Sequence, residues 1–298
     1  MRALLLILIL ILSSAANAHV GDRIYLIPEI TDDALAELDV SDQSLDDWTG
    51  ILANPTLTAS DFSSDPTVGE GTPYDPTDMD YQIWLGWNGS TSRLFFALER
   101  TDDNFINEYE GGNPGHFWRH DGAFFFSVDG DHSGGDYSGS ADSTWTDEEK
   151  TLNNNRTAQT FHGITDAPDG LHLGYDGAGV EWVCAVPYAG GSGGSTGEAP
   201  TTSIFEGFLT PFDDLLWHSP ERSTVSQLHA GKIIGFEIGI YDFDTEEEYS
   251  ISSYHALPLV PPWRYSEHFV DARLISGADD TAVESRSWAR IKASFQGK

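Results

Sequence analysis

Apolar and polar residues alternate along much of the chain, which is the pattern of strands that bury one face. Every second residue is apolar over residues 81–87 and again over residues 94–98. Asn88 and Gly89 follow the first of these segments, and both residue types readily adopt the left-handed backbone of a tight hairpin turn. The sequence therefore predicts a β-hairpin at this point.

Other apolar segments predict further strands. Residues 24–27 form a short run that Pro28 closes, which is typical of an edge strand. Residues 122–128 carry large apolar side chains on both faces, so we expect a central strand that is buried on both sides. The remaining alternating segments are residues 180–186, which Pro187 ends, residues 234–240 and residues 288–295.

Signals for helices are few, and polar stretches are long. Thr31 can cap a short helix that runs to Leu38, and Thr146 with Glu149 forms a capping box before a second one. Several strands, one or two short helices and long loops predict an all-β protein built as an antiparallel β-sandwich. The segments expected to be turns or loops are residues 44–48, 54–80, 130–170 and 190–197.

Residues 1–18 have the features of a cleaved signal peptide. Arg2 precedes a short apolar run, and Ala16, Asn17 and Ala18 match the small-x-small pattern of a cleavage site. The run is shorter than the roughly 20 apolar residues of a membrane span, and no later segment of the sequence is long and apolar enough to cross. We therefore expect a secreted or periplasmic protein that starts near His19.

Nothing in the pattern divides the mature chain into parts. We expect residues 19–298 to form a single domain, in which residues 130–232 contain a long loop-rich insertion. Hydrophobic residues make up 39% of the chain and aromatic residues 12%, which is enough for an extensive core. Cys184 is the only cysteine, so no intramolecular disulfide can form. A bound ion is then the more natural cross-link.

The chain is strongly acidic. It has 15 lysine and arginine residues against 48 aspartate and glutamate residues, a formal net charge of −33. Such a surface repels nucleic acids and anionic lipids and attracts cations. Most of these carboxylates are expected to form a solvated acidic coat, so only clustered ones are considered as ligands.

Several short motifs follow one another in a characteristic order. They are Leu45–Trp48, Arg93–Leu98 with Asp102 and Asp103, Trp118 with Asp121 before an apolar strand ending at Asp129, Glu181–Pro187, and Gly231–Ile238 with Tyr241–Asp244. In this order the motifs resemble the family 9 carbohydrate-binding modules (CBM9) and the related DOMON-like sandwiches. The resemblance covers most of the mature chain.

The resemblance implies a jelly-roll-like sandwich that binds the ends of sugar chains between tryptophans and carries structural calcium. Modules of this family usually accompany glycoside hydrolases that degrade plant or algal polysaccharides. The chain departs from the family pattern in three ways. Phe124 stands where the family strand has a carboxylate, the segment of residues 130–232 is longer, and no catalytic domain is attached. A hydrolase partner would therefore be a separate secreted chain.

Three carboxylates follow the apolar strand in a glycine-rich loop, at Asp129, Asp131 and Asp136. Calcium takes six to eight oxygen ligands in flexible geometry, and a loop of this kind can supply several of them. The simpler alternative is an ordinary Asp/Gly turn. Asp242 and Asp244 form a second, weaker candidate pair on one side of a strand, with a solvated strand end as the alternative.

Exposed indole rings stack on the apolar faces of sugars. Trp118 and Trp263 stand in polar segments and are the predicted platform, and Arg119, His120 and Arg264 are the predicted donors to sugar hydroxyls. Trp145 and Trp217 are reserve positions, whereas tryptophans on alternating strand faces are assigned to the core: Trp84, Trp87 and Trp182.

Two cofactor alternatives remain, and no catalytic motif stands out. An N-terminal His19 could bind copper, and Met79 with a histidine could ligate haem as in some DOMON-like proteins. No hydrolase or metalloprotease motif is present, and no carboxylate pair is singled out for glycoside hydrolysis. The sequence thus predicts a non-catalytic, calcium-stabilised carbohydrate-binding protein. A haem or copper redox protein and a surface or adhesive domain without a ligand are the alternatives.

Overall fold

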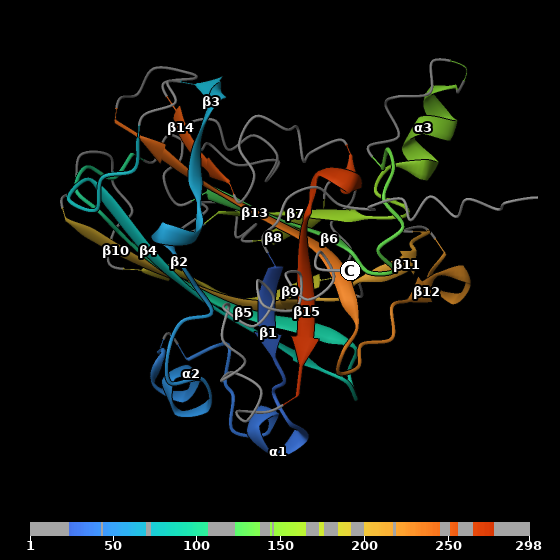
Figure 1. Cartoon of the computed structure of the whole chain (residues 1–298), viewed down its shortest axis with the longest axis horizontal. Coiled ribbons are helices and arrows are strands. Elements are labelled where there is room, and N and C mark those ends of the chain that lie inside the picture. Colours follow the sequence, from blue (N-terminus) through green and yellow to red (C-terminus); the bar gives the residue numbers. More distant parts are fainter. Residues whose placement is uncertain are drawn as a thin grey trace, which may run out of the picture.

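Two β-sheets face each other and enclose the main hydrophobic core (Figure 1). The computed structural model describes residues 24–42, 44–69, 73–106, 123–137, 144, 146–164, 173–175, 184–191, 200–216, 219–244, 251–255 and 265–276. In this part of the chain the predicted all-β sandwich is confirmed.

The smaller sheet has five strands in the order β2–β4–β5–β10–β9, and every neighbouring pair is antiparallel. Its centre is the hairpin of β4 and β5, which are paired over their whole lengths. The strands are β2 (Leu57–Thr58), β4 (Met79–Asn88), β5 (Arg93–Asp102), β9 (Cys184–Gly191) and β10 (Thr201–Leu209).

The larger sheet has eight strands, six of them in the order β1–β15–β13–β6–β7–β8, while β14 pairs with both β13 and β3. Only the pair of β1 and β15 is parallel among these strands. The strands are β1 (Ile24–Pro28), β3 (Ser63–Gly69), β6 (Ala123–Asp129), β7 (Gln159–Ile164), β8 (Leu173–Tyr175), β13 (Ile233–Phe243), β14 (Ile251–His255) and β15 (Val270–Ile275).

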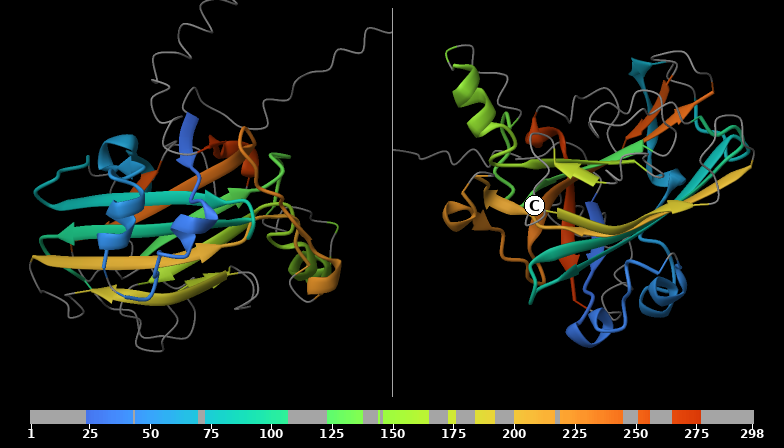
Figure 2. Two further views of the ribbon diagram at one scale, coloured as in Figure 1. Left: turned by 90° about the horizontal axis from the view of Figure 1, so that it is seen from below. Right: turned by 180° about the vertical axis from the view of Figure 1, so that it is seen from behind.

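The remaining elements are short and lie outside the two sheets. The helices α1 and α2 lie against the face of the five-stranded sheet that points away from its partner, and α3 stands apart (Figure 2). In the described part of the chain no helix is long and apolar enough to span a membrane. These elements are α1 (Asp32–Leu35), α2 (Asp46–Ile51), α3 (Asp147–Asn153), the 3-10 turns η1 (Ala59–Asp61), η2 (Pro220–Arg222) and η3 (Ser266–His268), and the paired strands β11 (Phe212–Asp214) and β12 (Thr224–Val225).

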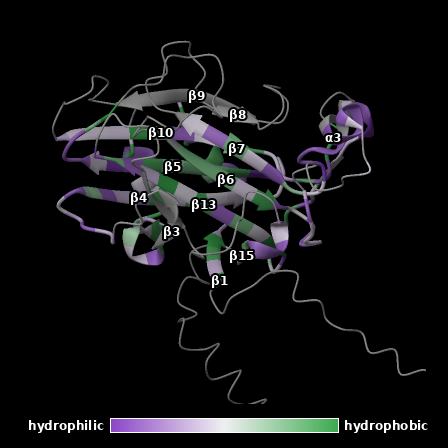
Figure 3. Ribbon diagram, turned by 90° about the horizontal axis from the view of Figure 1, so that it is seen from above, coloured by the Kyte–Doolittle hydropathy of each residue, from purple (hydrophilic) through white to green (hydrophobic). Residues whose placement is uncertain are grey.

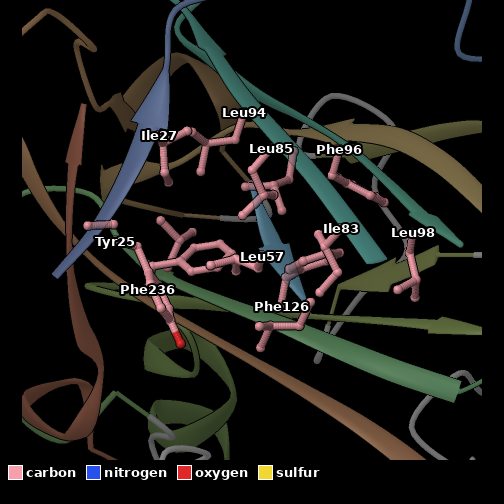
Figure 4. Packing of buried hydrophobic residues seen from close by; sticks show 14 of the residues in the cluster. Tyr25, Ile27, Leu57, Ile83, Leu85, Leu94, Phe96, Leu98, Phe126 and Phe236 are labelled. Carbon is pink, nitrogen blue, oxygen red and sulfur yellow. The ribbon is translucent and has the colours of Figure 1, made fainter. Parts of the chain in front are cut away.

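The core between the sheets combines aliphatic side chains with a group of aromatic rings (Figure 4). Phe96 of β5 stacks on Phe205 of β10 with ring centroids 5.7 Å apart, and it reaches Phe126 of the opposite sheet at 4.6 Å. Phe126 in turn contacts Phe236 of β13. Each fully buried phenylalanine contributes about 1.5–3 kcal/mol, so this aromatic contact between the sheets is a principal source of stability.

The predicted hairpin is confirmed, but its predicted turn is wrong. The apolar residues that alternate along β4 and β5 all point into the core, as expected. Four residues rather than two separate the strands, and the left-handed residue is Ser92, with φ 51°. Asn88 instead accepts hydrogen bonds at Oδ1 from the N–H and the hydroxyl of Thr91, at 2.9 and 2.8 Å. Its side chain closes the turn that its backbone was expected to form.

Three other expectations about elements are confirmed. β6 lies between β13 and β7 and is buried on both faces, and β1 is the edge strand of its sheet. Thr31 caps α1 by accepting a bond from the Ala34 N–H, and Thr146 and Glu149 form the capping box of α3. α3 is coloured mainly as hydrophilic in Figure 3, as a solvated helix should be.

Several segments expected to be turns or loops contain regular structure. Residues 46–48 begin α2, residues 54–80 include β2 and β3, and residues 130–170 include β7 in addition to the predicted helix α3. Pro187, expected to end a strand, lies inside β9 next to a register shift in its pairing with β10. β9 is the edge of its sheet, where a proline costs no ladder hydrogen bond. Residues 130–232, expected to be a loop-rich insertion, contribute β7 to β12.

Candidate functional site

The predicted sugar-binding residues lie outside the described part of the chain. They are Trp118, Arg119, His120, Trp263 and Arg264, together with the reserve positions Trp145 and Trp217. Trp182 and the predicted strand of residues 288–295 are outside it as well, as are the expected signal peptide of residues 1–18 and His19.

Phe124 occupies the place where the family resemblance predicts a carboxylate. Its side chain is fully buried and faces the core, where its ring meets those of Phe96, Phe126 and Phe205. A carboxylate here would be enclosed by aromatic rings and could not reach a ligand outside the sandwich. The departure at Phe124 therefore concerns the core and removes no ligand-facing group.

The described tryptophans are all buried, which confirms the core assignment of Trp84 and Trp87. Trp87 donates its indole N–H to the carbonyl of Ile275 at 3.0 Å and so ties β4 to the end of β15. Trp48 of α2 donates to Glu206 at 2.8 Å. Met79, considered above as a haem ligand in a polar loop, is 1% exposed in the main core at the start of β4.

The outer face of the eight-stranded sheet carries aromatic and polar side chains at its centre. The ring of Phe125 contacts the rings of His162 and Tyr241, and it lies so close to Gly239 that a Cβ there would come within 2.0 Å. Glu237 on the same face is fully buried. Burial raises the pKa of Tyr241. Because Phe125, Glu237 and Tyr241 are buried, the centre of this face is no open platform.

The acidic loop after β6 is held together by Asp129. This buried carboxylate accepts the backbone N–H groups of Ser133 at 3.1 Å and Gly134 at 2.7 Å. Burial raises its pKa to about 6, although the backbone N–H bonds act in the opposite direction. Asp131 is exposed, and Asp136 forms an isolated backbone bridge with Tyr265. This is the geometry of an Asp/Gly turn, and the predicted calcium site at Asp129, Asp131 and Asp136 stays a prediction.

Two other sets of carboxylates are gathered more closely in the described structure. In each set, one side-chain oxygen of every member lies within 4.8 Å of the others. The first, which we call the Asp242 cluster, consists of Asp78, Asp242 and Asp244. The second, which we call the Glu206 cluster, lies on the five-stranded sheet and consists of Asp42, Asp47 and Glu206.

The Asp242 cluster lies where one end of the five-stranded sheet meets the end of β13. Asp242 is 4% exposed, and no described residue donates a hydrogen bond to its carboxylate. Burial raises the pKa of Asp242 to about 7, and the charges of Asp78 and Asp244 add to the rise. Burial likewise raises the pKa of Asp78 to about 6. The pair of Asp242 and Asp244 predicted from the sequence is thus joined by a third carboxylate, Asp78, from the turn that precedes β4 of the opposite sheet.

One cation opposes this concentration of negative charge. Arg100 of β5 is buried, forms an ion pair with Asp102, and lowers the pKa of Asp242 without offsetting the effect of burial. Asn104 donates its side-chain N–H to the carbonyl of Asp244 at 3.2 Å and links the ends of β5 and β13. The cluster therefore has oxygen ligands, excess negative charge and a fixed frame, which together suit a hard divalent cation.

A surface cavity of about 490 Å³ opens beside α1 at the end of β4. Its lining includes Glu29, Asp32 and His229, while the one indole in it, Trp87, is only 2% exposed. Hydrogen bonds from Asn88 and Ser90 lower the pKa of Asp32. The cavity therefore presents polar and charged groups and no aromatic face for a sugar.

The fold matches solved structures. No protein-family model and no curated protein matches the sequence. A CBM9 module from Caldicellulosiruptor kristjanssonii, solved in complex with cellotriose, superposes with a TM-score of 0.50 at 12% identity over 88% of this chain and 98% of that one. The same kind of module in complex with glucose superposes with a TM-score of 0.50 at 12% identity over 86% of this chain and 98% of that one. The chain therefore has the β-sandwich fold of the family 9 carbohydrate-binding modules.

Proposed function

We propose that this protein binds carbohydrate without acting on it chemically, and that it does so outside the cytoplasm. The observation that carries the proposal is the superposition of nearly the whole described sandwich on modules solved with cellotriose and with glucose. Features consistent with a signal peptide at residues 1–18 support export. The proposed ligand is the end of a polysaccharide or oligosaccharide. A separately secreted glycoside hydrolase would degrade the polysaccharide to which the protein binds.

Sugar binding in this proposal rests on two tryptophans. Trp118 stands five residues before β6, and Trp263 stands two residues before Tyr265. Their indole rings would stack on the apolar faces of a sugar, while Arg119, His120 and Arg264 would donate to its hydroxyls. The buried frame around Phe124 and Phe125 gives β6 the rigidity that a site beside it requires.

Calorimetric titration with glucose, cellotriose and other oligosaccharides tests the proposal. We expect binding to weaken at least about tenfold in Trp118→Ala and in Trp263→Ala, a loss of about 1.4 kcal/mol or more. Trp84→Phe changes a buried tryptophan of the outer core and should bind as the wild type does. If no sugar binds the wild type at millimolar concentration, carbohydrate binding is wrong. If both variants bind normally, the assignment of the platform is wrong.

We propose further that a calcium ion at the Asp242 cluster stabilises the sandwich. The support is the almost fully buried carboxylate of Asp242, which has no hydrogen-bond donor among the described residues and lies beside Asp78 and Asp244. An ion bound by Asp78 and Asp242 would join the five-stranded sheet to β13 and lower their mutual repulsion. The chain has no disulfide to do this, because it has one cysteine.

Hydrogen exchange measured by mass spectrometry can separate the two calcium hypotheses. Calcium added to EDTA-treated protein should slow exchange at residues 239–244 in the wild type and not in Asp242→Asn. Asp131→Asn, which alters the loop after β6, should respond as the wild type does. The reverse pattern, with protection of residues 129–137 that Asp131→Asn abolishes, would place the ion at the predicted loop.

A further inference from the structure

A second, smaller core lies under the N-terminal helices, on the outer face of the five-stranded sheet. Trp48 of α2 is buried there against Trp84 and Ala97. Glu206 of β10 faces the same side, since its neighbour Phe205 points into the main core and Ala97 lies directly opposite it in the sheet. The side chain of Glu206 is fully buried. An acidic group therefore lies inside an otherwise apolar layer.

The two carboxylate oxygens of Glu206 have different surroundings. Oε1 accepts the indole N–H of Trp48 at 2.8 Å, whereas Oε2 is buried and has no hydrogen-bond partner. A buried carboxylate with one oxygen unpaired is costly. Its charged neighbours increase that cost, because Asp39, Asp42 and Asp47 all raise its pKa in addition to burial. A proton or a cation at the unpaired oxygen would remove this cost.

Asp42 and Asp47 are positioned to share that partner. A side-chain oxygen of each lies within 4.8 Å of the Glu206 carboxylate and of the other. Asp47 accepts the backbone N–H of Trp48 through Oδ1 and that of Asp39 through Oδ2, both at 2.7 Å. Asp42 accepts the N–H of Ser44 at 2.9 Å. These bonds hold both carboxylates in the loop before α2 and at its first turn, directed toward β10.

We propose that the Glu206 cluster is a second divalent-cation site, of the calcium class, that fastens the N-terminal segment to the sheet. The three carboxylates supply only oxygen ligands, which suits a hard cation, and a loop adapts to the large and flexible coordination shell of calcium better than to magnesium. The ion would be coordinated by Oε2 of Glu206 on β10 and by the carboxylates of Asp42 and Asp47 in the segment that covers the sheet. This site shares no residue with the Asp242 cluster, which includes two carboxylates at the end of β13 in the other sheet.

A proton on Glu206 is the competing explanation, and the two differ in their consequences. A proton would neutralise one charge and would be lost as the pH rises above neutrality. A divalent ion would neutralise two charges, and it would hold residues 39–51 on the sheet at neutral pH. The exchange rate of the amides in α2 therefore reports on which of the two is present.

The test is hydrogen exchange of α2 at pH 7.5 in the full-length mature protein, in EDTA and after addition of calcium chloride. We expect calcium to slow exchange at residues 46–51 by about tenfold, which corresponds to about 1.4 kcal/mol. Glu206→Gln keeps the shape of the side chain and its bond from Trp48, and it should abolish the effect. Asp42→Asn changes an exposed ligand and keeps an oxygen that can accept the N–H of Ser44, and it should weaken the effect.

Two control variants make the result specific. Asp46→Asn removes one negative charge from the first turn of α2, beside Asp47, at an exposed position outside the cluster. This variant should respond as the wild type does. Asp242→Asn should lose protection at residues 239–244 and keep it at residues 46–51. The proposal is overturned if calcium leaves α2 unchanged or if Glu206→Gln and Asp42→Asn respond like the wild type. Protection in EDTA at pH 6 equal to that given by calcium at pH 7.5 would also overturn it, in favour of a proton.

Discussion

At the scale of single residues, two buried tryptophans differ in whether the indole N–H has a hydrogen-bond partner. Trp48 and Trp84 lie in the same outer core, yet the indole N–H of Trp48 bonds to Glu206 and that of Trp84 has no partner. Both are fully enclosed by similar apolar neighbours. Replacing either with phenylalanine removes a comparable area, so the difference between the two variants isolates the hydrogen bond.

We predict that Trp48→Phe destabilises the protein by about 1–3 kcal/mol more than Trp84→Phe. The first change leaves both carboxylate oxygens of Glu206 without a donor, whereas the second removes an N–H that is already unsatisfied. Urea denaturation of both variants, compared at equal m-values, measures the difference. Equal losses would mean that the bond between Trp48 and Glu206 adds nothing to stability.

At the scale of elements, close packing between strands depends on glycines opposite large rings. Phe124 of β6 is paired with Gly163 of β7, and a Cβ at Gly163 would lie 2.2 Å from the Phe124 ring. That ring is held by its contacts with Phe126 and Phe205 and has no space to retreat. Gly50 in α2 offers a contrast, because nothing lies within 4 Å of a Cβ there.

We predict that Gly163→Ala costs about 1–3 kcal/mol by overpacking the core, whereas Gly50→Ala stabilises α2 by about 0.5–1 kcal/mol. The same substitution thus has opposite signs at two sites. Thermal unfolding of the two variants checks this directly. A neutral effect of Gly163→Ala would show that β6 and β7 can separate without cost.

At the scale of the whole molecule, the formal net charge is −33. Within this acidic chain the fold raises the pKa of several carboxyl groups. Burial raises the pKa of Asp78 and Asp129 to about 6 and that of Asp242 and Glu206 to about 7. The ordinary values are 3.8 for aspartate and 4.5 for glutamate. These groups therefore bind protons more tightly in the folded chain than in the unfolded one.

We predict that in EDTA the free energy of unfolding falls as the pH rises from about 4 to about 7. In this pH range the folded state binds more protons than the unfolded state. The stabilisation from these protons is therefore complete below the pKa values of the unfolded state, and it is lost as the pH rises through the pKa values of the folded state. Each fully buried group contributes up to about 1.4 kcal/mol per pH unit. Urea titrations at a series of pH values measure the slope, and calcium should flatten it. A rise in stability toward pH 7 in EDTA would contradict the prediction.

The main strands and the caps of two helices could be predicted from the sequence. The alternation of β4, β5 and β13, the two-sided burial of β6 and the capping box of α3 follow from contacts within a few residues, and such contacts leave a local pattern. β7 and β10 have polar residues at buried positions, so they lack a clear alternating pattern. They form strands because they pair with β6 and β5. The turn after β4 likewise depended on the Asn88 side chain rather than on its backbone preference.

The candidate sites were only partly predictable from the sequence. Asp242 and Asp244 are two residues apart and form a pair that the sequence predicts, but Asp78 joins them from the turn before β4 of the other sheet. Glu206 carried no signal at all, because one acid on a strand is ordinary until Trp48, Asp42 and Asp47 are folded over it. The sequence by itself determined the sandwich, because strands with alternating apolar residues must remove one face from contact with water. Only the tertiary structure decided which carboxylates meet, because burial and charge act between segments that are distant along the chain.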